Sequence, residues 1–181
     1  PPRSTLFPYT TLFRSSFDDE RGVYVDNFPI RGYSGSYFQR IRKDILKDFD
    51  RFLGYDLIVL QYGENVSSAK NTDYNHYKQS MIRTIKHIQS AVPKVPILVV
   101  SAHDRSIKIG TEYMTSPDIP ILVKAQSELA IETKTAFWNL YEAMGGYNSM
   151  LSFVRKSPAW AGKDYTHRSE EHTSELQSPN T

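Results

Sequence analysis

The sequence has 181 residues and 39% hydrophobic residues, which is enough for one globular domain with a core of its own. Its 22 basic and 20 acidic residues give a net charge of +2, and their interspersion argues against a nucleic-acid-binding surface. No apolar run approaches the roughly 20 residues that a membrane-spanning helix needs. The chain has no cysteine, which excludes disulfides, thiolate metal ligands and a cysteine nucleophile.

The two ends of the chain differ from its middle. Residues 1–15 and 168–181 show no periodicity that continues into their neighbours, and both read as translated sequencing-library adapter sequence. We therefore expect residues 1–15 and 168–181 to be adapter-derived and non-native, and they are excluded from the fold prediction. The segment 16–167 is expected to be one domain fragment, truncated at both ends.

Strands and helices are predicted to alternate along the segment 16–167. The β-branched and aromatic run 23–28 favours a first strand, and apolar residues three and four apart predict a helix from Phe38 to Phe52, ended by Gly54. The nearly continuous apolar run 56–63 is typical of a strand covered on both faces. The same reasoning predicts a helix over 74–92, a strand over 96–102, a helix over 117–133, a strand over 136–141 and a short helix over 148–156.

This alternation indicates a three-layer α/β/α fold around a parallel, flavodoxin-like sheet. In parallel sheets, functional residues gather in the loops at the carboxyl ends of the strands. That rule selects four places: Gly32, the turn 63–65, the segment 102–105 and the segment after Tyr141.

The loop near residue 165 carries a candidate acid–base pair. Asp164 precedes His167 by three residues, so its carboxylate can turn back and accept the Nδ1 proton of the imidazole. That contact would leave Nε2 free to act as a general base. Taken alone, the pair is weak evidence, since an ordinary exposed loop histidine is the commoner explanation of this pattern.

Two further positions could supply hydrogen-bond donors to a cleft. Asn65 follows Gly63 at the end of an apolar strand, where its amide could point into the cleft, although an asparagine that caps the next turn is the simpler interpretation. Gly32 follows the first predicted strand, and its N–H group could approach a ligand closely because no Cβ intervenes. A plain turn glycine is the better explanation of Gly32 when nothing else is considered.

Together and in this order, these motifs resemble the SGNH/GDSL hydrolase family. The Asn-x-x-Ile-x-Gly block is matched by Asn27, Ile30 and Gly32, and the Gly-x-Asn block by Gly63 and Asn65. The closing Asp-x-x-His block is matched by Asp164 and His167, and the stretch 137–146 resembles a subgroup of secreted or periplasmic bacterial members. The resemblance covers nearly all of residues 16–167 and implies the SGNH hydrolase fold.

The resemblance implies a serine esterase or acylhydrolase that acts on a carboxylic ester, including O-acyl groups on carbohydrate, without a metal or cofactor. His167 would be the general base, Asp164 would orient it, and Gly32 and Asn65 would stabilise the oxyanion. The nucleophilic serine of the family's Gly-Asp-Ser block is missing from this chain, so the chain is expected to be inactive. Ser34 and Ser36 follow the second block and are poor substitutes. The family's first strand and closing helix are also expected to be missing.

Two alternatives remain open at this stage. A non-catalytic, flavodoxin-like α/β binding module would show the same alternation of strands and helices. The segment His103-Asp104-Arg105 could line a substrate pocket, but a solvated loop with a local Asp104–Arg105 pair is the favoured interpretation. The resemblance suggests a periplasmic or secreted protein, and the sequence predicts neither a nucleic-acid partner nor a transmembrane segment in this chain.

Overall fold

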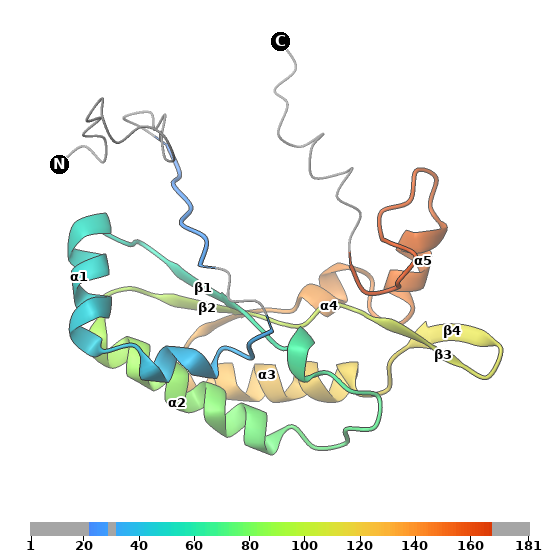
Figure 1. Ribbon diagram of the computed structural model, residues 1–181, viewed down its shortest axis with the longest axis horizontal. Coiled ribbons are helices and arrows are strands. Elements are labelled where there is room, and N and C mark those ends of the chain that lie inside the picture. The colour runs from blue at the N-terminus through green and yellow to red at the C-terminus, as the bar shows by residue number, and fades with distance from the viewer. Residues whose placement is uncertain (1–21, 29–31, 168–181) are drawn as a thin grey trace, which may run out of the picture.

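A computed structural model describes residues 22–28 and 32–167 of the chain (Figure 1). Its main sheet is parallel and has the order β1-β2-β5, formed by β1 (Ile58–Gln61), β2 (Ile97–Val100) and β5 (Ala136–Trp138). Val59 lies opposite Leu98, and Leu98 lies opposite Ala136. This parallel α/β architecture confirms the predicted fold class.

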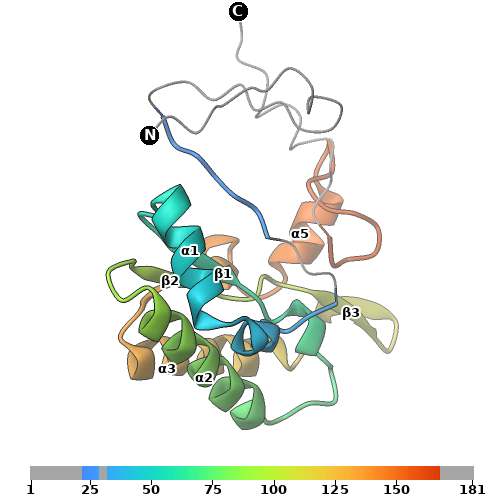
Figure 2. The same ribbon diagram turned by 60° about the vertical axis from the view of Figure 1, so that its left-hand side comes forward.

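Two long helices cover one face of this sheet. They are α2 (Asn75–Ala91) and α3 (Ile119–Thr133), which run side by side below the strands in Figures 1 and 2. Alternate strand residues point toward these helices, as the period of two in a strand requires. The core between the layers contains Leu60, Ile85, Val99, Leu122 and Leu129, each at most 3% exposed.

The predicted helix over 38–52 is divided into two pieces. A 3-10 helix, η1 (Ser36–Arg40), comes first, and α1 (Lys43–Leu53) follows after Ile41 and Arg42 adopt extended backbone angles. The predicted end of the helix at Gly54 is confirmed, because Gly54 has the left-handed φ of 60° that glycine tolerates best. Both pieces pack against α2.

The carboxyl-terminal part contains the remaining elements. A hairpin of β3 (Ser106–Ile109) and β4 (Glu112–Thr115) follows β2, and the sequence analysis missed it. The predicted strand over 136–141 is shorter than expected, because Leu140 begins the short helix α4 (Leu140–Ala143) after the Asn139 side chain caps it. The last helix, α5 (Ser149–Arg155), lies within the predicted range 148–156. Earlier in the chain, between β1 and α2, Gly63 is followed by a second 3-10 helix, η2 (Glu64–Val66).

Two predictions about the strands are wrong. Residues 23–28 form no strand in the described part of the chain, because no neighbouring strand supplies them with a hydrogen-bond ladder, and Val23 and Val25 are 92% and 83% exposed. The strand β1 was expected to be covered on both faces, but Val59 on the face away from α2 is 52% exposed. In the described residues, β1 is also an edge strand, paired with β2 alone.

Candidate functional site

The three parallel strands end on the same side of the molecule, and the hairpin β3–β4 and the helix α5 lie on that side (Figure 1). Gln126 of α3 closes the gap where β1 and β2 separate at this end. Its Nε2 donates to the Tyr62 carbonyl at 2.6 Å, and its Oε1 accepts the Ala102 N–H group at 2.8 Å. The side-chain amide thus continues the hydrogen bonding of the sheet into the loops that carry the candidate site.

Gly63 allows this close approach of Gln126. A Cβ atom on Gly63 would lie 2.7 Å from Gln126 Nε2, and the φ of Gly63 is +131°. The Gln126 amide cannot move aside without losing the hydrogen bonds to Tyr62 and Ala102. The glycine of the Gly-x-Asn motif therefore has a packing role that the sequence alone does not reveal.

We expect Gly63→Ala to lower the free energy of unfolding by about 2–4 kcal/mol, the sum of backbone strain and a steric overlap. Gly54→Ala is the matched control, because Gly54 also has a positive φ but a Cβ there would meet no atom within 4 Å. Its expected cost is about 1 kcal/mol. Urea unfolding of both variants measures the difference, and equal costs would show that Gln126 adjusts freely.

The Asn65 side chain contacts Tyr33, the residue after Gly32. The Asn65 Nδ2 group donates to the Tyr33 carbonyl at 3.1 Å, and Asn65 is exposed. Gly32 has a φ of +78° and open space where a Cβ would stand. The Ile30 position of the predicted motif lies outside the described residues.

Asp164 and His167 form the predicted pair. His167 Nδ1 lies 2.5 Å from Asp164 Oδ2, and the other carboxylate oxygen accepts the backbone N–H groups of Thr166 and His167. The hydrogen bond from His167, with the backbone donors adding to it, lowers the pKa of Asp164 to about 2. The carboxylate therefore stays ionised at neutral pH, and a proton on Nδ1 leaves Nε2 of the exposed ring available for proton transfer.

The loop that carries this pair is fastened to the end of the sheet. The Ser106 N–H group of β3 donates to the Tyr165 carbonyl at 3.0 Å, and the Tyr113 and Tyr165 rings stack with their centroids 3.9 Å apart. Gly162 donates its N–H group to the His167 carbonyl at 2.8 Å, which closes the loop. The hairpin β3–β4 thus positions the histidine.

The segment after β2 differs from the favoured prediction of a solvated loop with an Asp104–Arg105 pair. Asp104 is fully buried, and its Oδ2 accepts the Met150 N–H group at the start of α5 at 2.8 Å. The side chain of Arg105 is 19% exposed, and its Nη2 lies 3.8 Å from the buried carboxylate of Asp118. The burial of both side chains shows that this segment is part of the structural frame.

Asp118 fastens the segment that follows Asn65. Its carboxylate accepts hydrogen bonds from the Ser67 hydroxyl at 2.6 Å, the Ser68 N–H group at 2.8 Å and the Tyr74 hydroxyl at 2.8 Å. The hydroxyl of Ser116 contributes a further short bond. These donors, together with the charge of Arg105, hold the pKa of Asp118 below its usual value despite burial, which raises it. None of these roles was predicted from the sequence.

The candidate residues thus form two groups. The first is Asn65 with the Gly32–Tyr33 backbone, and the second is Asp164 with His167. Within residues 22–28 and 32–167, no hydrogen bond or ion pair links the two groups directly. Ser34 and Ser36 hydrogen-bond to each other at 3.2 Å beside Tyr33.

Among the described residues, no cluster of three or more histidine, aspartate or glutamate side chains could hold a metal ion.

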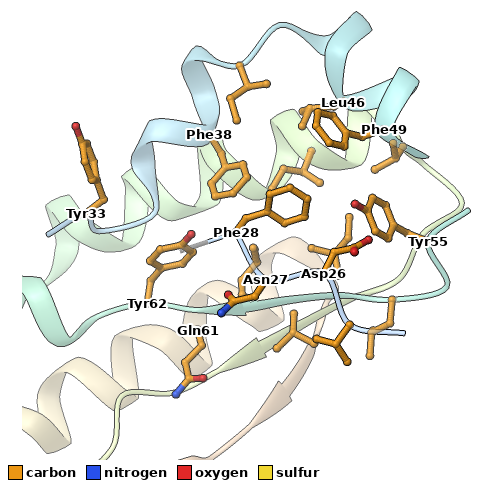
Figure 3. Close-up of a pocket in the computed structure, with 18 of the residues that line it drawn as sticks. Asp26, Asn27, Phe28, Tyr33, Phe38, Leu46, Phe49, Tyr55, Gln61 and Tyr62 are labelled. Atoms are coloured by element: carbon orange, nitrogen blue, oxygen red, sulfur yellow. The ribbon is translucent and has the colours of Figure 1, made fainter. Parts of the chain in front are cut away.

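A cavity of 1290 Å³ lies along the open edge of β1. Figure 3 shows Asp26, Asn27 and Phe28 on one side of it, Gln61 and Tyr62 at the end of β1, and the aromatic residues of η1 and α1 around the rest. The Phe28 ring packs edge-on against Phe49 with a centroid distance of 5.7 Å. Asn65 and His103 also line the cavity, so it reaches the candidate donor site.

None of the described helices is long and apolar enough to span a membrane.

Comparison with known proteins relates the chain to an esterase. No family model and no curated protein matches the sequence. Among solved structures, the chain is similar to a peptidoglycan O-acetylesterase, with a TM-score of 0.64 and 26% sequence identity. The match covers 81% of this chain and 43% of the esterase chain, so the chain spans less than half the length of that protein. The fold of the chain is therefore like that of an O-acyl hydrolase.

Proposed function

We propose that the chain is part of a serine esterase of the SGNH/GDSL type that removes O-acyl groups from carbohydrate. The observation that carries the proposal is the Asp164–His167 pair, held by β3 at the end of the sheet in a fold similar to that of a peptidoglycan O-acetylesterase. The carboxylate orients the imidazole in the way that a general base in acyl transfer requires.

In the proposed mechanism, a serine hydroxyl attacks the acyl carbon and His167 Nε2 takes the hydroxyl proton. The tetrahedral oxyanion receives hydrogen bonds from the Asn65 amide and the Gly32 N–H group. Collapse of the intermediate releases the carbohydrate alcohol, which takes the proton back from His167. Water then attacks the acyl-serine with the same base, and the carboxylic acid leaves.

We further propose that the serine that this mechanism needs lies on a strand upstream of Gly22, and that residues 1–15, which read as adapter sequence, stand in its place. The cavity beside β1 supports this placement, because an additional strand there would pair with the open edge and lie next to the Gly63–Asn65 turn. A chain in which residues 1–15 are replaced by the natural sequence of the gene is called the restored chain below.

Replacement of Asn65 tests the proposed oxyanion site. In the restored chain, we expect Asn65→Ala to lower kcat for p-nitrophenyl acetate by about 10²–10³-fold, since one oxyanion donor is lost. Asn75→Ala is the matched control, because Asn75 lies exposed at the start of α2, outside the residues that line the cavity. Equal rates for the two variants would contradict the role of Asn65.

A further inference from the structure

Glu64 is a half-buried acidic residue that the proposed mechanism does not use. It lies between Gly63 and Asn65, and its Oε1 accepts the backbone N–H group of His103 at 2.9 Å. This bond ties the turn that carries Asn65 to the end of the neighbouring strand β2. The second oxygen, Oε2, is buried and has no hydrogen-bond partner among the described residues.

An ionised carboxylate at this position costs free energy, because it is partly removed from water. Burial raises the pKa of Glu64, and the facing charges of His103 and Arg105 oppose that effect while Asp118 adds to it. A raised pKa means that the stability Glu64 contributes is present at acidic pH and is lost as the pH rises through that pKa. A glutamine would accept the same N–H group without this cost, which indicates that the charge itself has a use.

The negative charge of Glu64 faces the His103 ring. Its Nδ1 lies 2.7 Å from the Asp104 carbonyl, so Nδ1 carries a proton, because a carbonyl can only accept. The other nitrogen, Nε2, faces Glu64 Oε1 at 3.7 Å. A lone pair on Nε2 would repel the carboxylate, whereas a proton on Nε2 makes an ion pair with it. Both side chains line the cavity that reaches Asn65.

We propose that Glu64 is a positioning residue for Asn65. In this proposal the His103 ring keeps the Glu64 carboxyl ionised, and the ionised carboxylate accepts the His103 N–H group. The inference rests on the proposed function, since it assigns Asn65 the role of oxyanion donor. Protonation of Glu64 removes the charge that attracts the His103 N–H group and ring, so Asn65 is positioned less well, even though the neutral acid costs the fold less free energy. The other ionisable groups that face Glu64 are Arg105 after β2, Asp118 at the start of α3 and Tyr77 of α2, whose pKa burial raises to about 12.

The pH profile of the restored chain tests this pair. As the pH falls, His167 and Glu64 both take up protons, so log kcat/KM should decline with a slope of about two. In Glu64→Gln the slope should fall to about one, because only the general base still titrates. Glu128→Gln is the matched control: it removes the carboxylate charge from the 2.7 Å surface ion pair with Lys78 and should leave the slope at about two. A merely structural Glu64 would lower the rate at every pH and leave the slope unchanged.

A second measurement does not depend on activity. Carbon-13 NMR of the Glu64 carboxyl should show it titrating above the ordinary glutamate range. In His103→Gln, which keeps the backbone N–H group, that titration should move to still higher pH because the ring charge that lowers the pKa of Glu64 is lost. An ordinary titration that His103→Gln does not move would overturn the proposal. If the titration behaves as expected but the restored chain cleaves no ester, the pair stands and the proposed function fails.

Discussion

The 181-residue chain should hydrolyse p-nitrophenyl acetate no faster than its own His167→Ala variant, whereas the restored chain should show turnover that His167→Ala removes. The present chain contains no Gly-Asp-Ser serine for His167, the proposed general base, to activate. In an intact triad, loss of one member lowers kcat by roughly 10⁴–10⁶-fold. Steady-state rates of the four proteins make the comparison.

Ser34→Ala is the control for a substitute nucleophile. Ser34 follows Tyr33, whose carbonyl accepts a hydrogen bond from the Asn65 amide, so Ser34 is a candidate substitute nucleophile. The restored chain should keep its rate in Ser34→Ala. Turnover in the present chain that depends on both His167 and Ser34 would show that Ser34 is the nucleophile and that no upstream serine is needed.

The second large effect concerns self-association of the 181-residue chain. The open edge of β1 bears unpaired backbone groups, Val59 within the strand is 52% exposed, and Leu57 just before it is 48% exposed. An uncovered apolar edge strand is a template for pairing with another chain. We therefore expect size-exclusion chromatography with light scattering to show oligomers or aggregate instead of a monomer.

A charged residue on this edge should weaken the association. Val59→Lys is expected to lower the association constant by about tenfold or more, because paired copies would bring like charges together. Ile131→Lys is the control, since Ile131 is 76% exposed on α3, away from β1. A monomeric wild-type chain with a cooperative melting transition would contradict the expectation and would argue that residues 16–167 are a complete domain.

Periodicity predicted the frame of the fold because most strands and helices have residue patterns that match their burial. The helix α2 shows this, since Tyr77, Met81, Ile85 and Ile88 recur at helical spacing and all point into the core. The run 23–28 has the β-branched and aromatic composition of a strand, but no strand lies beside it in the described residues. Propensity alone therefore gave the wrong prediction. The hairpin β3–β4 was missed, although Ile109-Gly110-Thr111-Glu112 between alternating residues is a recognisable turn signal.

The candidate site was predictable only where a motif is local. Asp164 and His167 are three residues apart, so their contact follows from the sequence. The supporting residues are far apart in the chain: Gln126 contacts Tyr62 and Ala102, and Asp118 contacts Ser67. A buried glutamine and a buried aspartate look like surface residues in a sequence, because their burial depends on partners that only the fold brings together.

The upstream serine is the central claim, and covalent labelling tests it most directly. The restored chain is incubated with a fluorophosphonate, and the modified residue is found by intact mass and peptide mapping. We predict one adduct per chain, on the serine of a Gly-Asp-Ser sequence upstream of Gly22, and a strong loss of labelling in His167→Ala. An unlabelled restored chain, or an adduct that is independent of His167, would contradict the proposed esterase.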